Sequence, residues 1–182
     1  MLNVKHAVVL SVSMSLLFIS GCSATRHISV NAPLKSTLSK YQIMKIEPFF
    51  YDSTVEIMDQ AKADALKQMF QERVKYNIYT LNLFAKVVDK EPIQETERVV
   101  LLKGRITYMK RLTKTARIML GAMAGRAGVA VHVQLEDGLS GESLGEADIE
   151  GKSSGGTIFA GGTEQAFEEA ANQIAEFVKN NY

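Results

Sequence analysis

The stretch Val129-Ala130-Val131-His132-Val133-Gln134-Leu135 places a Val or Leu side chain at every second position. Because successive side chains of a strand point to opposite faces, this pattern predicts a strand with one buried face and one exposed face. Residues 100–108 repeat the pattern, with apolar side chains alternating with Lys103, Arg105 and Thr107. The fold is therefore expected to be organised around a sheet with one solvent-facing side.

The flanking segments predict the other elements. Strands are expected at 41–47, where Pro48 ends the pattern, at 84–88 and at 146–152. Ser53 to Glu56 has the spacing of a capping box, and an apolar period from Met58 to Leu81 predicts a long helix. Thr163 is expected to cap a terminal helix, whose core face comprises Phe167, Ala170, Ala171, Ile174, Phe177 and Val178. The prediction is an α+β fold, a mostly antiparallel sheet of about five strands with two helices packed on one face.

The composition excludes several classes of protein. The 182 residues suit one globular domain, and the single Cys excludes an intrachain disulfide and a Cys-rich metal site. With 21 basic and 20 acidic side chains, the formal net charge is +1, which gives no electrostatic case for nucleic acid as a partner. We expect no nucleic-acid binding, and no cofactor other than a covalent lipid.

The N-terminal residues have the layout of an export signal. Lys5 and His6 precede an apolar stretch at 7–19, which is shorter than the ~20 residues of a membrane-spanning helix. Ile19-Ser20-Gly21-Cys22 follows and resembles the bacterial lipobox. The resemblance implies cleavage between Gly21 and Cys22, a thioether-linked diacylglycerol on Cys22, and an acyl chain such as palmitate on the new amino group. The alternative is an ordinary secreted protein with an incidental free Cys.

These signals define an expected domain organisation. A lipoprotein signal peptide occupies 1–21, a Ser/Thr-rich lipidated tether occupies 22–40, and a single periplasmic α+β domain occupies 41–182. Residue 23 is Ser rather than Asp, a pattern associated with sorting to the outer membrane. We therefore expect a lipid-anchored outer-membrane protein whose folded domain faces the periplasm.

A basic block is the best local indication of a binding partner. The segment 98–135 contains no acidic residue. The candidate anion-facing patch consists of Lys103, Arg105, Lys110, Arg111, Lys114 and Arg117. Such a patch could face lipid phosphates or another anionic envelope polymer, and the alternative is a solvated strand face.

Catalytic and metal-binding residues are not expected. His132 is the only His in the predicted domain, and it falls on the polar face of its strand. The acidic residues between Glu136 and Glu150 include spacings compatible with paired carboxylates for sugar hydrolysis, but solvation explains their alternation better. The sequence thus predicts no catalytic residue and no metal ligand, and we expect a protein that is not an enzyme.

Several motifs resemble a bacterial lipoprotein family, domain of unknown function 4410. They are Leu102-Lys103-Gly104-Arg105-Ile106-Thr107, Gly125-Arg126-Ala127, Val131-His132-Val133-Gln134-Leu135-Glu136-Asp137, and Gly151-Lys152-Ser153-Ser154-Gly155-Gly156. The family brings no established activity, so the resemblance implies no catalytic residue. Its layout is similar to that of the periplasmic domains of curli-type secretion lipoproteins, which form rings.

The expected function follows from the anchor and the patch. We expect a non-enzymatic, outer-membrane-anchored lipoprotein that binds or helps to assemble an envelope component. Its expected partners are the membrane, through the lipid, and an envelope protein or anionic polymer. The alternative is a ring-forming subunit of a secretion or pore complex, in which case the chain would form a homo-oligomer.

Overall fold

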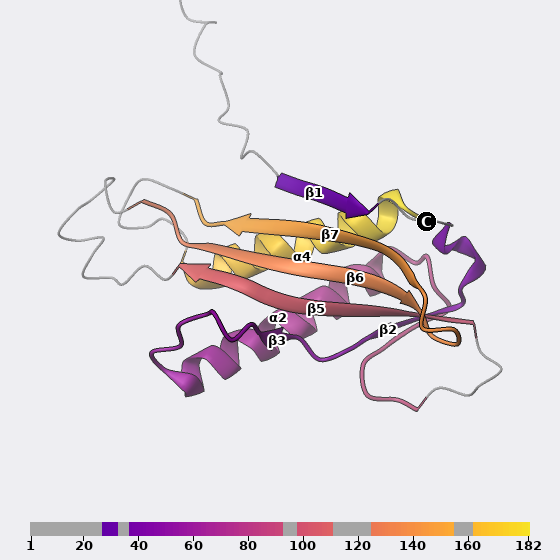
Figure 1. Cartoon of the computed structure of the whole chain (residues 1–182), viewed down its shortest axis with the longest axis horizontal. Coiled ribbons are helices and arrows are strands. Elements are labelled where there is room, and N and C mark those ends of the chain that lie inside the picture. Colours follow the sequence, from indigo (N-terminus) through magenta and orange to yellow (C-terminus); the bar gives the residue numbers. More distant parts are fainter. Residues whose placement is uncertain (1–26, 33–36, 93–97, 111–124, 155–161) are drawn as a thin grey trace, which may run out of the picture.

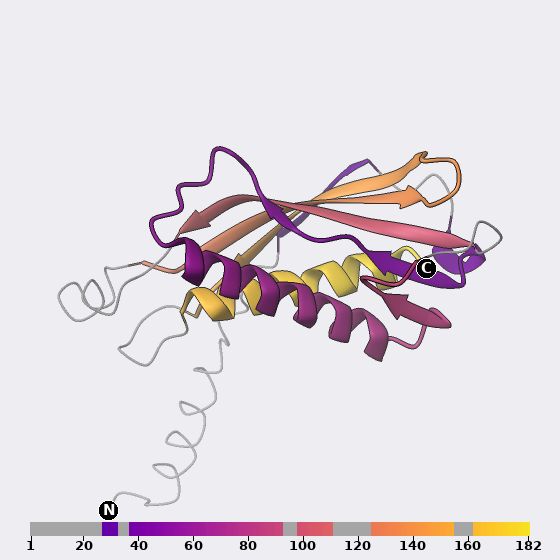
Figure 2. The same ribbon diagram turned by 90° about the horizontal axis from the view of Figure 1, so that it is seen from below.

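The computed structural model describes residues 27–32, 37–92, 98–110, 125–154 and 162–182. Figure 1 shows a twisted sheet as one layer, and Figure 2, turned by 90°, shows both helices on the same face of that sheet. In chain order the elements are β1 (His27–Ala32), the short 3₁₀ helix η2 (Leu38–Lys40), β2 (Ile43–Ile46), β3 (Phe50–Tyr51), α2 (Gln60–Thr80), β4 (Lys86–Val88), β5 (Val99–Lys110), β6 (Gly128–Asp137), β7 (Ser143–Lys152) and α4 (Thr163–Asn180).

Among the described residues, the sheet has seven strands in the order β1-β7-β6-β5-β2-β4, with β3 paired to β5. The pairs β1/β7, β7/β6 and β6/β5 are antiparallel, whereas β2/β5, β2/β4 and β3/β5 are parallel. The predicted α+β class is confirmed, but a mostly antiparallel sheet of about five strands is wrong, because the sheet is mixed and larger. The prediction assumed hairpins between successive strands, whereas α2 carries the chain back between β2 and β4, so that these two strands run in the same direction.

Two strands, β1 and β3, were not predicted. β1 lies within the segment 22–40 that the sequence analysis assigned to a tether, and it pairs antiparallel with β7 from His27↔Glu150 to Ala32↔Glu146. β3 contributes only Phe50 and Tyr51, just beyond Pro48. Only four residues, 23–26, therefore separate Cys22 from the first strand.

The buried face of β6 agrees with the alternation that predicted it. Val131, Val133 and Leu135 have no exposed surface, while the residues between them are half-buried. On the helix side, the core contains Phe70 of α2 and Phe167 of α4, whose ring centroids lie 5.3 Å apart. The two helices thus cover one face of the sheet and leave its other face polar.

The start of α2 differs from the prediction. The helix begins at Gln60, and the side chain of Asp59 caps it by accepting a hydrogen bond of 3.0 Å from the backbone N–H of Lys62. Met58, expected in the core, is 86% exposed. The residues near Ser53 instead form a turn, because the Asp52 carboxylate accepts hydrogen bonds from both the backbone N–H and the hydroxyl of Thr54.

Helix α4 lies directly on the backbone of β7. A Cβ atom at Gly151 would overlap the backbone carbonyl oxygen of Ala166 and lie 2.7 Å from the backbone nitrogen of Ala170. The buried Gln173 side chain donates a hydrogen bond of 2.8 Å to the carbonyl oxygen of Glu150. The N-cap of α4 is Gly162, whereas the predicted cap was Thr163. Neither of the helices among the described residues is long and apolar enough to cross a bilayer.

Candidate functional site on the polar sheet face

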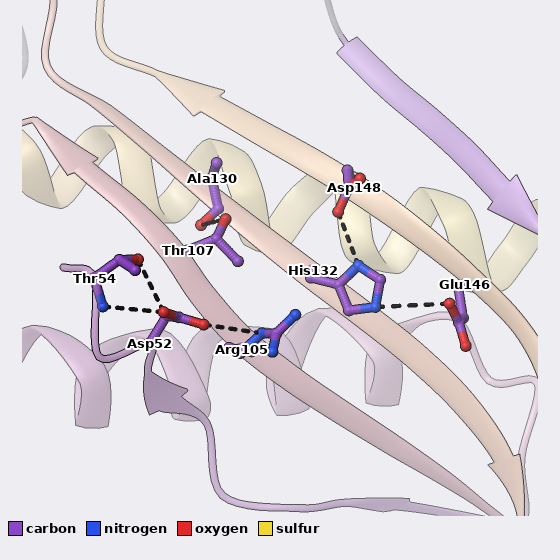
Figure 3. Close-up of polar contacts among 8 residues, drawn as sticks. All are labelled: Asp52, Thr54, Arg105, Thr107, Ala130, His132, Glu146 and Asp148. Atoms are coloured by element: carbon purple, nitrogen blue, oxygen red, sulfur yellow. Dashed lines mark hydrogen bonds and ion pairs between the residues drawn. The ribbon is translucent and has the colours of Figure 1, made fainter.

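The sheet face opposite the helices carries a row of polar side chains across four strands. Arg105 of β5 is paired in register with His132 of β6, His132 with Asp148 of β7, and Asp148 with Ser29 of β1. Figure 3 shows Arg105, His132 and Asp148 side by side on this face. Since directly opposed residues on one face have Cβ atoms about 4.5–5.5 Å apart, the row forms one continuous surface.

Asp148 is the centre of this row. One of its oxygens lies 2.8 Å from His132 Nδ1, and the other accepts a hydrogen bond of 2.5 Å from the Asn31 side-chain amide. Partial burial opposes ionisation of Asp148, but the hydrogen bonds from Asn31 and His132 outweigh it and hold the pKa of the carboxyl below its usual range. His132 Nε2 lies 3.8 Å from the Glu146 carboxylate on its other side. Asp148 thus joins β1, β7 and β6 through side chains as well as through the backbone.

The first two residues of the predicted anion-facing patch are paired with carboxylates. Lys103 Nζ lies 2.6 Å from Glu136 Oε2, and Arg105 Nε lies 3.4 Å from Asp52 Oδ2 (Figure 3). Both acids come from neighbouring segments of the sheet layer. The charges of Lys103 and Arg105 are therefore largely neutralised within the protein itself.

The other predicted site residues have different outcomes. Lys110 is exposed at the last position of β5. The predicted patch residues Arg111, Lys114 and Arg117 lie outside the described residues, as do the lipidation and cleavage residues Gly21 and Cys22. The structure thus brings Lys103 and Arg105 into one polar face and places Lys110 at its end.

Asp52 and Asn31 were not among the predicted site residues. The sequence Asp52-Ser53-Thr54 is a recognisable Asx-turn signal, but the competing capping-box pattern starting at Ser53 hid it. Asn31 carried no usable signal, because its role depends on the pairing of β1 with β7. Both residues contribute to the polar face only through the fold.

A second polar contact holds the turn between β6 and β7. The hydroxyl of Tyr41, a buried residue, donates a hydrogen bond of 2.6 Å to Asp137 Oδ2. This bond, together with the backbone N–H groups of Ser140 and Leu139, lowers the pKa of Asp137 to about 2. Burial, followed by the hydrogen bond to Asp137, raises the pKa of the Tyr41 hydroxyl above its usual range. The contact links the start of β2 to the end of β6.

The rest of the described surface offers no comparable site. A shallow hollow on α2 is lined by Met69, Glu72, Arg73 and Tyr76, and Arg73 is engaged by Glu168 of α4 at 3.2 Å. Within the described ranges, no three or more His, Cys, Asp or Glu side chains are grouped as a metal site would require. The polar sheet face is therefore the main candidate surface of the described residues.

The sequence matches one family over most of its length. The family model of a domain of unknown function, DUF4410, matches residues 34–157. The chain belongs to the DUF4410 family. The family resemblance predicted from the motifs is thus confirmed. The match runs from before β2 to beyond β7 and leaves β1 and α4 outside it.

Several solved structures of distant proteins are similar to this chain. The PelC dodecamer from Paraburkholderia phytofirmans is similar with a TM-score of 0.53 and 13% identity, covering 81% of this chain and 94% of that chain. A point variant of the same dodecamer gives a TM-score of 0.51 at 11% identity, with the same coverage of 81% and 94%. A DUF330 protein from Xanthomonas campestris is similar with a TM-score of 0.47 and 11% identity, covering 80% of this chain and 87% of that chain. A comparison with curated proteins finds no match. At these identities the likeness to PelC shows the fold alone.

Proposed function

We propose that this chain is an outer-membrane lipoprotein whose periplasmic domain binds or helps to assemble an envelope component without enzymatic activity. The anchor is the diacylglycerol expected on Cys22, the only Cys of the chain, which follows Ile19-Ser20-Gly21. Three acyl chains at about 0.8 kcal/mol per buried CH₂ would hold the protein at the membrane permanently. Ser23 supports delivery to the outer membrane.

The pairing of charges on the polar sheet face supports binding as the mode of action. Lys103, Arg105 and His132 each have a carboxylate neighbour on an adjacent segment. A general acid or base must be aimed at a proton of the substrate. Side chains that pair with one another across strands instead hold the sheet surface in one arrangement, which suits recognition of a large partner.

Lipidation is tested by Cys22→Ala in the producing cell, with palmitate labelling and membrane fractionation. The unchanged chain is expected to take up label, shorten by the signal peptide and fractionate with the outer membrane. Cys22→Ala is expected to remain unlabelled and unprocessed, whereas Ser20→Ala, which keeps a small residue before the cleavage site, behaves as the unchanged chain. A processed, membrane-retained Cys22→Ala protein would contradict the proposal.

Outer-membrane sorting has its own test. Ser23→Asp changes only the residue after the lipidated Cys22 and should move the labelled protein to the inner-membrane fraction. Retention of the variant in the outer membrane would show that Ser23 does not direct sorting.

The second candidate function is a ring-forming subunit of a secretion or pore complex. It is favoured by the likeness to the PelC dodecamer over 81% of this chain. The sheet order also places β1 and β4 at its two edges, and edge strands can pair with another copy. Light scattering of the lipidated protein in detergent tests this function: a discrete large oligomer supports it, and a monomer at all concentrations refutes it.

A further inference from the structure

Three exposed basic residues gather at one end of the sheet. Lys110 ends β5, Lys152 ends β7, and Arg126 lies just before β6. Lys110 and Lys152 both pair in register with Gly128, the first residue of β6, so the three strands end in the same row. We call Lys110, Arg126 and Lys152 the basic end.

The basic end carries an excess of positive charge that the middle of the sheet lacks. Lys152 lies 2.7 Å from the Glu150 carboxylate, and both side chains are about half exposed. Within the part of the chain that the structure describes, neither Lys110 nor Arg126 has a carboxylate at ion-pair distance. By contrast, Lys103 and Arg105, which lie earlier in β5, are each paired with an acid. Along β5, positive charge is thus available to an outside partner only at the end of the strand, where Lys110 lies.

The first turn of α4 lies close to the basic end. Gly151 of β7 packs against the backbone of Ala166, and Gln165 accepts hydrogen bonds from Ser154. The N-terminus of a helix carries a partial positive charge, which here is offset by Glu164 in the first turn. The beginning of α2, capped by Asp59, lies at the same end in the helix layer (Figures 1 and 2). The basic surface is therefore confined to the sheet layer.

The chain enters the sheet beside the basic end. β1 starts at His27, which is paired with Glu150, two residues before Lys152. Cys22 precedes His27 by five residues, from 22 to 27. Five fully extended residues span at most about 18 Å. A lipid on Cys22 would therefore hold His27, which lies beside the basic end, within about 18 Å of the membrane surface. A tether extending to residue 40 would have imposed no such limit.

We propose that the basic end is a docking surface for anionic lipid headgroups, so that the domain stands with this end against the bilayer and the turn at 138–142 away from it. The proposal rests on the lipid anchor proposed above. Two independent features support it: the complementary charge, and the short length of chain between Cys22 and β1. Each Lys or Arg close to an anionic membrane strengthens binding by about fivefold, and the effect decreases with salt.

The single Cys allows a direct measurement of this orientation. In the lipidated full chain the thiol of Cys22 is consumed by the thioether, so an introduced Cys is the only free thiol. Tyr108→Cys places a fluorophore near the basic end, and Leu139→Cys places one in the β6–β7 turn; these positions are 53% and 62% exposed. The protein is reconstituted into vesicles with a headgroup quencher, made of phosphatidylcholine alone or with phosphatidylglycerol.

The fluorophore at 108 is expected to be quenched more strongly in vesicles that contain phosphatidylglycerol than in vesicles of phosphatidylcholine alone. The fluorophore at 139 is expected to be quenched equally in both. Changing Lys110, Arg126 and Lys152 to Glu should reduce the ratio of docked to undocked protein by roughly tenfold or more. The matched control changes three other exposed lysines to Glu, namely Lys86, Lys90 and Lys179, and should leave the quenching at 108 unchanged.

Flotation with phosphatidylcholine vesicles separates failure of the anchor from failure of the docking surface. If the chain floats with both kinds of vesicle but the two fluorophores respond alike, the docking surface is refuted and the anchor stands. An equal loss of quenching in the control variant also refutes the docking surface, because any reduction of positive charge, wherever it lies, would then be enough to weaken docking. If the chain does not float with phosphatidylcholine, the anchor is refuted and the docking proposal falls with it.

Discussion

Gly151→Ala tests whether α4 depends on direct contact with the backbone of β7. The added methyl group would overlap the carbonyl oxygen of Ala166 and lie 2.7 Å from the backbone nitrogen of Ala170. Both atoms belong to the helix backbone, so no rotamer change can make room, and α4 must move off the sheet as a unit. That movement disturbs the packing of Phe167 and Ile174, which have no exposed surface.

The expected loss is at the upper end of the range for overpacking, about 3 kcal/mol in the free energy of unfolding. For a chain of this size, about 3 kcal/mol corresponds to a fall in Tm of roughly 6–12 °C. Urea unfolding of the chain from residue 23 onward, followed by circular dichroism, measures the loss as a lower midpoint at an unchanged slope.

Gly128→Ala is the matched control. Gly128 lies in the neighbouring strand, and an added Cβ would have its nearest contacts at 3.8 and 3.9 Å, an ordinary packing distance. Its stability should change by less than about 1 kcal/mol. Gly104→Ala gives an intermediate case, because the added methyl group would overlap only the ring of Phe49, and Phe49→Leu should partly restore stability. Equal urea midpoints for Gly151→Ala and Gly128→Ala would refute the reasoning.

Three further changes test other contacts. Asp59→Ala removes the N-cap of α2 and should lower the free energy of unfolding in urea by about 1 kcal/mol. Ser53→Ala, at the position that the sequence pattern favoured, should have no effect. A larger loss of stability in Ser53→Ala than in Asp59→Ala would place the cap at Ser53. Tyr41→Phe removes a hydrogen bond to the Asp137 carboxylate and should lower stability by about 2 kcal/mol at neutral pH. The pKa of Asp137 is lowered to about 2, so this stabilisation is complete above the ordinary carboxyl pKa of about 3.9 and is lost as the pH falls through about 2. A stability difference between the unchanged chain and Tyr41→Phe that does not change with pH would contradict this expectation. Asp148→Asn removes the charged group that bonds to side chains of both β1 and β6. The backbone amides of β1 should then exchange hydrogen roughly tenfold faster, while those of β6 keep their rates. Unchanged exchange in β1 would show that backbone pairing alone keeps β1 on the sheet.

The central strands and the terminal helix could be predicted from local patterns. The alternation at 129–135 corresponds to the burial of β6, because one face of this strand packs against the helices. The apolar period at 167–178 likewise corresponds to the buried face of α4. In α2 the apolar period that ends at Leu81 agrees with the buried positions Val74 and Ile78. Its first turns were placed on the wrong face, because Met58 lies before the helix begins.

The edge strand and the state of the basic patch could not be predicted locally. β1 becomes a strand only by pairing with β7, more than 100 residues later in the chain. The segment 98–135 contains no acid, yet Lys103 meets Glu136 from β6 and Arg105 meets Asp52 from beyond β3. The charge pattern along the chain therefore identified the cations but not their partners. Whether a cation is neutralised or available depends on the strand beside it.

The pairing of β1 with β7 also sets an order on folding during synthesis. The ribosome makes His27 before its partner Glu150, and at about 5–20 residues per second the intervening chain takes roughly 10 s to appear. The segments β2, α2 and β4 are all made within this interval, before the partner of β1 exists. The strand that is made first is therefore added last. Until β7 is complete, β1 lacks the strand with which it pairs.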